Sequence, residues 1–551
     1  MAHPPGEVYP RPTTTALSGS SVDTRPAFGD SGAAWTVILA SAIYSGSFIY
    51  YTSFVVDGIR HFSLFDDAMI SMRYAKNLAA GYGLVWNPGG ERVEGYTNPL
   101  WVLYMAVLHW LPVPASKISL LVQVTGLILL LINLCLVRKI ARAISDDPLP
   151  VSLGAMVLTA FYLPLVNWSV QGMEVGLLTC LTSWTVWLVL RSLQTGQFSA
   201  WPYVVLGLAT LVRLDMVVAF VAITGFLLFK DPANRHLHLV LGGAILGTSL
   251  VIQTGFRLWY FEDPLPNTYY LKMTGYPIVL RVTRGLYVLS KFVAQMGFAL
   301  FLLPVVALAI RRDIAARLLL CVLSGQLLYS VYVGGDAWEE WGGSNRYISL
   351  AMPLFFILLA RALFDVGGLV RHSARLTRLR IPVYGALLLS SLLSLNCIYG
   401  AEALGEWALR TRPMHAVTNH GHVELAYVVQ RVTRPDATVA VTMAGVFPYF
   451  ANRVAIDLLG KADGHVARLP MKTFHGLRSL IWFLPGHLKW DFAHSIGKLR
   501  PDVVLPMGEL TKDAEEFMRD YRRVTIGASV LYLLETSETV LWSEIDKSPG
   551  T

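Results

Sequence analysis

Long apolar runs follow one another along most of the chain and are separated by short polar segments. Several approach the roughly 20 residues that a helix needs to cross a bilayer, so the pattern predicts a polytopic α-helical membrane protein. The run at 200–230 is long enough for two helices, which we expect to meet between Arg213 and Asp215. The runs lie at residues 35–56, 98–113, 117–137, 149–167, 172–190, 200–230, 237–259, 285–310, 318–333, 347–364 and 381–400.

Basic residues between the runs indicate the side of the membrane on which each loop lies, because cytoplasmic loops collect Lys and Arg. The run at 98–113 is short and bounded by Pro99 and Pro112. It therefore predicts an interfacial helix that does not cross. About eleven spans then place every basic cluster on the cytoplasmic side of the membrane. The polar segments lie on the outer side, together with the first outer loop, 57–116. The clusters are at 138–142, 230–235, 311–317 and 371–380, and the polar segments at 171–176, 213–215, 261–272 and 334–347.

The two ends of the chain differ from this central region, 35–400. Residues 1–34 are rich in Pro, Ser, Thr and Gly and predict a disordered cytoplasmic tail. Residues 401–551 predict a small periplasmic α/β domain without a nucleotide-binding motif. Strand patterns lie at 438–443, 453–458, 502–505 and 530–534, and helical patterns at 423–432 and 511–521.

Composition agrees with a membrane protein. Of 551 residues, 54% are hydrophobic and 15% are charged, below the roughly 25% charged residues of a soluble domain. The net charge of +8 is accounted for by cytoplasmic loops, and no basic stripe with interleaved aromatics indicates a nucleic-acid partner. All four cysteines fall inside apolar runs, so we expect no disulfide and no Cys-based site.

The segment from Phe65 to Trp101 is polar and dense in charge, and it begins with Asp66 and Asp67 where the first apolar run ends. One aspartate would suffice to cap the helix that follows. Two adjacent carboxylates at a membrane surface therefore predict a general base or a metal ligand. The residues leave open which aspartate is the base and whether a divalent cation joins the pair.

Further polar residues near this segment are candidates for binding a sugar or an acceptor. Arg73, Glu94 and Asn98 belong to the same segment. Glu174 is flanked by apolar sequence, where an ionisable group is costly unless it is paired or faces a cavity, and we expect it to face a cavity. Arg213 and Asp215 are expected to form a structural ion pair.

Two cations in outer segments are candidates for holding a phosphate at the level of the lipid headgroups. Lys272 follows a proline-rich turn, and Arg346 precedes an apolar run. The alternative is that both anchor the protein to anionic lipid. Asn267 and Asp336 lie close to them in sequence and join the sugar and acceptor candidates, whereas Trp338 is expected to be an interfacial belt residue.

The segment DDAMISMRYAKNLAAGYGLVWNPGGERVEGYTNPLW resembles the GT-C superfamily of membrane glycosyltransferases. More narrowly, it resembles the terminal arabinofuranosyltransferases of mycobacterial cell-wall synthesis and their bacterial relatives. Weaker family-like blocks follow in the same order through the chain: GMEVG, LVRLD, LPNTYYLK, GGD, IDLLG and PGHLKWD.

The resemblance implies inverting transfer of a sugar, with arabinofuranose as the candidate, from a polyprenyl-phosphate donor to a hydroxyl of a cell-envelope glycan. The reaction is expected on the outer face of the bacterial cytoplasmic membrane, with Asp66 or Asp67 as the catalytic carboxylate. A transporter or flippase of lipid-linked glycans is the alternative, and it predicts ionisable groups on both faces and deep in several spans. A scaffold is a third reading, and it predicts that both aspartates are dispensable.

Overall fold

The structure is a computed structural model that describes residues 28–311, 313–339, 345–368, 379–397, 401–472, 481 and 483–545. Most of the predicted disordered tail, residues 1–27, lies outside this range. The remainder of that prediction is wrong, because α1 (Phe28–Thr52) already begins within it. The first apolar helix thus starts seven residues before the predicted apolar run at 35–56.

Helices form most of the apolar runs. Within the described residues, five helices are long and apolar enough to cross a membrane, or up to seven if two bent pairs are counted as spans. The prediction of about eleven spans therefore stays a prediction. The five are α1, α4 (Ala115–Ala143), α7 (Val175–Thr195), the helix at α10 (Arg235–Tyr260) and α14 (Ile314–Val333).

Two runs that we predicted as single spans are each broken. The first is α5 (Pro148–Ala160) with α6 (Leu163–Val170), bent by 56°, and α6 has a proline in its first turn. The second is α12 (Ile278–Met296) with α13 (Phe298–Arg311), bent by 94°. Gly297 separates these helices with a φ of 96°, a conformation that glycine adopts without a steric penalty.

The expected division of the run at 200–230 is confirmed. α8 (Trp201–Val212) ends at Arg213, whose extended backbone (φ −153°, ψ 127°) interrupts the helix. The short turn η1 (Leu214–Met216) then leads into α9 (Val217–Lys230). The remaining apolar helices are α3 (Pro99–His109), α16 (Met352–Gly368) and α18 (Arg380–Asn396). The predicted interfacial run at 98–113 thus contains a helix of only 11 residues.

A five-stranded mixed sheet forms in the C-terminal region, in the order β4-β3-β5-β7-β6. β3 pairs in parallel with β4 and β5, and β7 pairs antiparallel with β5 and β6. The strands are β3 (Thr438–Val441), β4 (Val454–Asp457), β5 (Val503–Val504), β6 (Tyr521–Ile526) and β7 (Ser529–Leu534).

The helical pattern predicted at 511–521 is confirmed for its first part only. α24 (Thr511–Ala514) and η5 (Glu515–Phe517) are helical, and β6 begins at Tyr521, the last residue of the predicted segment. Gly527 has a φ of 59° and joins β6 to β7 in a tight hairpin. The helix is therefore shorter than its local spacing predicts, and the chain continues directly into a strand pair.

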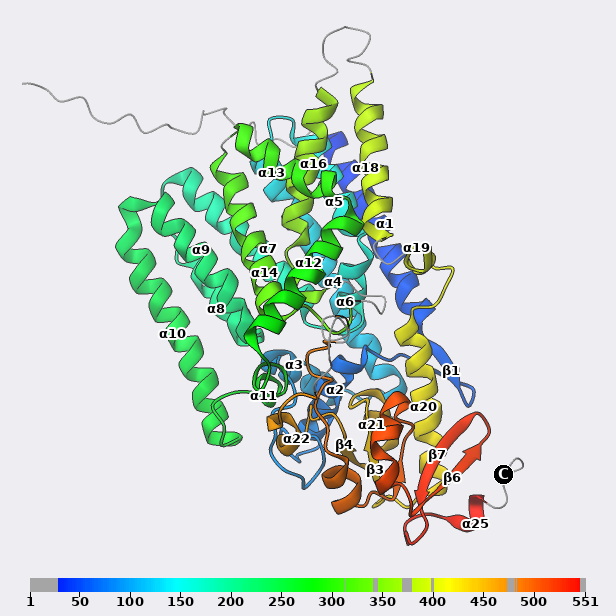
Figure 1. The fold of residues 1–551 in the computed structure, drawn as a ribbon. Helices are drawn as coiled ribbons and strands as arrows, with labels where there is room; N and C mark the ends of the chain where they lie inside the picture. Colours follow the sequence, from blue (N-terminus) through cyan, green and yellow to red (C-terminus); the bar gives the residue numbers. More distant parts are fainter. Residues whose placement is uncertain are drawn as a thin grey trace, which may run out of the picture.

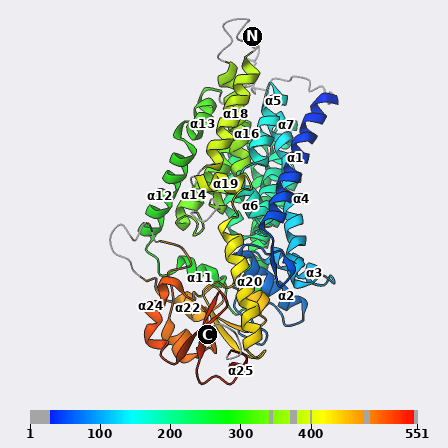
Figure 2. The same cartoon turned by 90° about the vertical axis from the view of Figure 1, so that its right-hand side faces the viewer.

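The apolar helices lie toward one end of the molecule and the sheet lies at the other, with α2 (Asp66–Ala79) between them (Figure 1). A quarter-turn view shows α20 (Met414–Val432) running beside the sheet (Figure 2). One hydrophobic core includes Met69 of α2, helices of the bundle and Phe447 of α21 (Val446–Ala451). The C-terminal region therefore packs directly on the helix that carries the aspartate pair.

Candidate active site

Polar segments that are far apart in the sequence converge beside the first turn of α2. They line a pocket with a cavity volume of about 50 Å³, which we call the polar pocket. Its walls come from α2, the loop at 95–98, α11 (Asn267–Met273), the segment around α15 (Arg346–Ser349) and two loops of the C-terminal region. The charged and aromatic side chains used below are Asp67, Lys272, Trp338, Arg346, Lys461 and His487.

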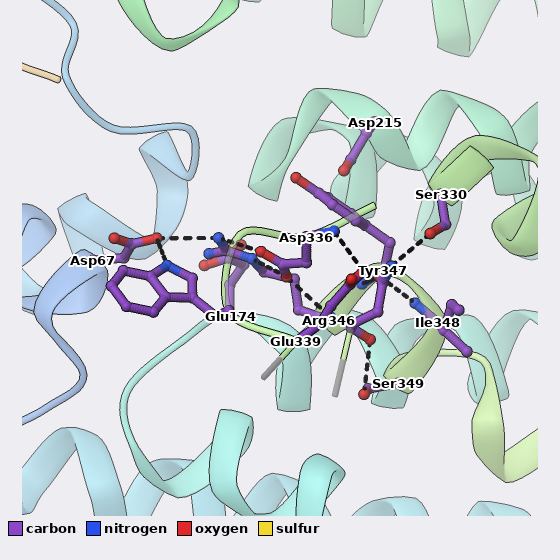
Figure 3. Close-up of polar contacts among 12 residues, drawn as sticks. Asp67, Glu174, Asp215, Ser330, Asp336, Glu339, Arg346, Tyr347, Ile348 and Ser349 are labelled. Atoms are coloured by element: carbon purple, nitrogen blue, oxygen red, sulfur yellow. Dashed lines mark hydrogen bonds and ion pairs between the residues drawn. The ribbon is translucent and has the colours of Figure 1, made fainter. Parts of the chain in front are cut away.

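Asp67 lies with its carboxylate in the polar pocket. Its Oδ2 accepts hydrogen bonds from Arg346 Nη2 at 3.1 Å and from Trp338 Nε1 at 3.3 Å (Figure 3). Its Oδ1 is buried and has no hydrogen-bond partner. Burial acts to raise the pKa of Asp67, but Arg346 and Lys272 hold that pKa well below its usual range. Asp67 is therefore an anion with one free oxygen.

Asp66 is directed elsewhere, although it is adjacent in sequence. It is only 3% exposed, it is not among the residues that line the polar pocket, and its Oδ1 accepts a hydrogen bond from the Val446 backbone N–H at 2.8 Å. A Cβ placed on Gly445 would lie 1.9 Å from the Asp66 carbonyl oxygen. Asp66 thus belongs to the contact between α2 and the C-terminal region.

Arg346 forms a fork between two carboxylates. Its Nε and Nη2 lie 2.8 and 3.1 Å from the two oxygens of Asp336, and Nη2 also contacts Asp67 (Figure 3). Asp336 is buried and holds the arginine through these bonds. Lys272 lines the same pocket, and burial together with the Arg346 charge lowers its pKa to about 8. The two cations predicted to bind a phosphate therefore lie on one pocket.

A second, wider pocket, with a cavity volume of about 410 Å³, adjoins the first, and both Lys272 and Arg346 line the two pockets. Apolar side chains form much of its wall, including Val217, Met273 and Val333. We call it the wide pocket. A cavity with a largely apolar wall that also reaches Lys272 and Arg346 has the chemistry to receive a lipid chain with an anionic head.

The expected ion pair between Arg213 and Asp215 is confirmed, with Arg213 Nε 2.8 Å from Asp215 Oδ1. Arg213 also pairs with Glu174 at 2.8 Å, and both residues line the wide pocket, as predicted for Glu174. The second oxygen of Glu174 accepts a hydrogen bond from Asn98 Nδ2 at 2.8 Å, and Asn98 reaches the polar pocket. A buried polar network therefore connects the two pockets.

Three other candidates do not line the polar pocket. Glu94 pairs with Arg257 at 2.7 Å beside a separate, mainly apolar pocket. Arg73 donates hydrogen bonds to the Trp86 and Arg453 carbonyls. Asn267 donates to the carbonyls of Gly460 and Lys461 at 2.9 and 3.1 Å. These contacts join elements of the fold, and a role for these three side chains in sugar or acceptor binding stays a prediction.

Sequence reasoning missed three residues of the polar pocket. Trp338, expected in the interfacial belt, instead donates its indole N–H to Asp67 and packs edge-on against His487. Lys461 and His487 come from the C-terminal region. The available signal was their position, because Lys461 directly follows IDLLG and His487 lies within PGHLKWD, two of the family-like blocks.

A divalent cation does not fit the polar pocket well. Among the residues that the structure describes, no group of three or more His, Cys, Asp or Glu side chains could hold a metal ion. The Asp67 carboxylate also interacts with the charges of Arg346, Lys272 and Lys461. These cations would repel a metal ion bound beside it.

The stability of the protein should depend on pH through Asp66. Burial raises its pKa from 3.8 to about 6, so the folded protein keeps this proton over a range in which an unfolded carboxyl loses it. The free energy of unfolding then falls as the pH rises from about 4 to about 6. Asp66→Asn removes this titrating carboxyl, while the amide oxygen of the asparagine can still accept a hydrogen bond from Val446. The melting temperature of the mutant relative to wild type should therefore rise as the pH rises over that range.

Melting curves of purified protein in detergent from pH 4.5 to 7.5 measure this difference. Asp436→Asn, which removes an exposed carboxylate of the C-terminal region, is the matched control and should follow wild type. Parallel curves for wild type and Asp66→Asn would contradict the assignment.

Comparison with protein families gives two matches. Residues 115–256 match the family described as dolichyl-phosphate-mannose-protein mannosyltransferase, and residues 411–542 match a domain of unknown function (DUF8728). The first match covers α4 to most of α10, and the second covers nearly all of the C-terminal region.

Two characterised relatives share a name. The chain is 28% identical over 218 residues to the terminal β-(1→2)-arabinofuranosyltransferase of Mycobacterium tuberculosis, covering 37% of this chain and 34% of the relative. It is 26% identical over 399 residues to the enzyme of the same name from Corynebacterium glutamicum, covering 64% of this chain and 54% of the relative. The chain thus matches about a third to a half of the length of these relatives.

Solved structures share the fold over almost the whole chain. ArnT from Cupriavidus metallidurans bound to undecaprenyl phosphate aligns with a TM-score of 0.55 and 12% identity, covering 92% of this chain and 99% of ArnT. The oligosaccharyltransferase AglB from Archaeoglobus fulgidus, in complex with an inhibitory peptide and a dolichol-phosphate, aligns with a TM-score of 0.57 and 10% identity, covering 94% and 76%. At these identities the similarity shows a common fold.

Proposed function

We propose that this chain, which belongs to the GT-C superfamily of membrane glycosyltransferases, transfers a sugar from a polyprenyl-phosphate donor to a hydroxyl of a cell-envelope glycan. One observation carries the proposal: an ionised carboxylate with a free oxygen lies in the same pocket as two cations. Glycosyl transfer needs both, since a proton must be removed from the acceptor and a phosphate must be stabilised as it leaves.

In this proposal Asp67 is the general base. Its free Oδ1 takes the proton of the acceptor hydroxyl while the hydroxyl oxygen attacks the anomeric carbon. The bond between that carbon and the phosphate oxygen breaks, and its electron pair stays on the phosphate. Attack opposite to the leaving group inverts the configuration at the anomeric carbon.

Arg346 and Lys272 receive the donor phosphate in this mechanism. Arg346 suits a phosphate because its planar group presents several donors, and Asp336 holds that group in place. As the phosphate draws these two cations toward itself, Asp67 is less strongly paired and its basicity rises. The wide pocket, which shares both cations, would hold the first isoprene units of the donor.

The names of the relatives supply the candidate sugar. Arabinofuranose follows from the two arabinofuranosyltransferases, and a lipid-phosphate donor agrees with the undecaprenyl phosphate and the dolichol-phosphate bound in the ArnT and AglB structures. Asn98 and Glu174 stand where sugar or acceptor hydroxyls would meet the pockets. We place the reaction on the periplasmic face of the bacterial cytoplasmic membrane, because the predicted topology puts the basic clusters on the opposite side.

The test is a transfer assay with purified wild-type protein. Synthetic farnesyl-phosphoryl sugars, including arabinofuranose, are offered with labelled glycan fragments, and the matching nucleotide sugars serve as controls. We expect transfer from one lipid-phosphate sugar, with inversion, and none from the nucleotide sugars. If no sugar is transferred, and the protein instead moves a lipid-linked glycan across the membrane of proteoliposomes, the transporter function would replace this proposal.

A further inference from the structure

We infer that Lys461 is a third cation for the donor phosphate, so that the C-terminal region of unknown function completes the active site. The inference rests on the function proposed above. It assigns a role to the C-terminal region, which contains none of the residues used in the proposed mechanism. It predicts that loss of Lys461 weakens binding only of ligands that carry a phosphate.

Lys461 is a buried cation that lacks a hydrogen-bond partner. The residue is 6% exposed, its Nζ makes no hydrogen bond, and the carboxylates of Asp66 and Asp457 interact with its charge only through space. It lines the polar pocket together with Lys272 and Arg346. A buried ammonium group without hydrogen bonds is unfavourable, because burial removes the hydrogen bonds that water would make with it. An anionic ligand in the pocket would supply the missing hydrogen bonds.

The loop that carries Lys461 is held in place by several contacts. Asp457, at the end of β4, accepts hydrogen bonds from the backbone N–H groups of Leu459 and Ala462 at 3.0 and 2.6 Å. Gly460 has a φ of 79°, which allows the turn. These bonds fix the backbone on both sides of Lys461, so its side chain leaves from a defined position.

The same loop is tied to the helix that carries Lys272. Asn267, the first residue of α11, donates its side-chain amide to the carbonyls of Gly460 and Lys461, and Lys272 follows on the same helix. A Cβ on Gly95 would lie 2.9 Å from the Lys461 carbonyl, so the loop at 95–98 also packs against it closely. Two lysines from distant parts of the chain are thereby presented to one pocket.

The charges around the pocket indicate what the third cation does. Lys272 and Arg346 face Asp67 and Asp336, whereas the charge of Lys461 acts on the buried carboxylates of Asp66 and Asp457 without a hydrogen bond from its Nζ. When the anomeric bond breaks, the phosphate gains a second negative charge, and Asp67 becomes neutral by accepting the acceptor proton. Lys461 then supplies a third positive charge on the pocket, and without it less of the charge on the leaving phosphate would be compensated.

The experiment compares the binding of two probes that differ only in phosphate, farnesyl phosphate and farnesol, to purified full-length protein in detergent. Lys461→Met should weaken farnesyl phosphate binding on the order of 10- to 100-fold and leave farnesol binding within about twofold. Lys498→Met, which removes an exposed lysine of the same region, is the matched control and should bind both probes as wild type does. Lys461→Arg keeps the charge and should retain most of the phosphate selectivity.

The outcomes separate this inference from the proposed function. Equal farnesyl phosphate binding by wild type and Lys461→Met would overturn the role of Lys461 and leave the glycosyltransferase standing. Failure of wild type to prefer farnesyl phosphate over farnesol would overturn the lipid-phosphate donor and the inference with it. Equal weakening of both probes by Lys461→Met and by Lys461→Arg would show that the lysine only maintains the loop, and would also overturn the inference.

Discussion

Replacing Asp67 with asparagine is expected to lower the rate of sugar transfer on the order of 10²- to 10⁴-fold, the usual contribution of a general base. Asparagine has the same shape, and its side-chain oxygen can still accept from Arg346 and Trp338. The mutant therefore loses the proton acceptor but keeps the pocket. The initial rate of transfer from the donor identified for wild type measures the effect, with kcat falling and the donor KM changing little.

The adjacent aspartate provides the control for this experiment. Asp66→Asn removes the same charge one residue away, but that side chain contacts Val446 and does not line the polar pocket. Transfer by Asp66→Asn should stay within about tenfold of wild type, below the range for losing a general base. The reverse result, a collapse in Asp66→Asn with activity kept in Asp67→Asn, would identify Asp66 as the base and overturn the mechanism.

Arg346→Met should have the largest combined effect on stability and activity. The change leaves Asp336 buried with only Lys272 and a backbone N–H to offset its charge, and it leaves Asp67 without its nearest cation. Removing one member of a buried ion pair costs about 3–5 kcal/mol, so the melting temperature should fall by several degrees. Transfer should be undetectable, because the donor phosphate loses its bidentate partner.

A double mutant separates these two effects. Asp336→Asn combined with Arg346→Met removes the unpaired buried carboxylate, so we expect part of the lost stability to return. Transfer should not return, because asparagine supplies no cation for the phosphate. Recovery of transfer in the double mutant would mean that Arg346 acts only by neutralising Asp336, which would remove it from the donor site.

The local sequence was sufficient to predict most of the helices and strands and the class of reaction. Apolar runs near 20 residues indicated the helices, since a membrane-spanning helix needs that length whatever its neighbours are. Asp66 and Asp67 marked the start of α2 and the site itself, because two adjacent carboxylates exceed what a helix cap requires. Lys272 and Arg346 were identified as phosphate candidates because they lie in outer segments at the level of the lipid headgroups, and the structure places both on one pocket.

Tertiary contacts decided everything that depends on residues distant in sequence. The two aspartates have different environments because one meets Val446 and the other meets Arg346, each hundreds of residues away along the chain. The breaks within the runs at 149–167 and 285–310 follow from backbone turns that hydropathy does not record. The pairing of β6 with β7 likewise depends on contacts that the local pattern at 511–521 does not show. Lys461 remained invisible for the same reason: its free ammonium becomes informative only once β4 and α11 bring it beside Asp67.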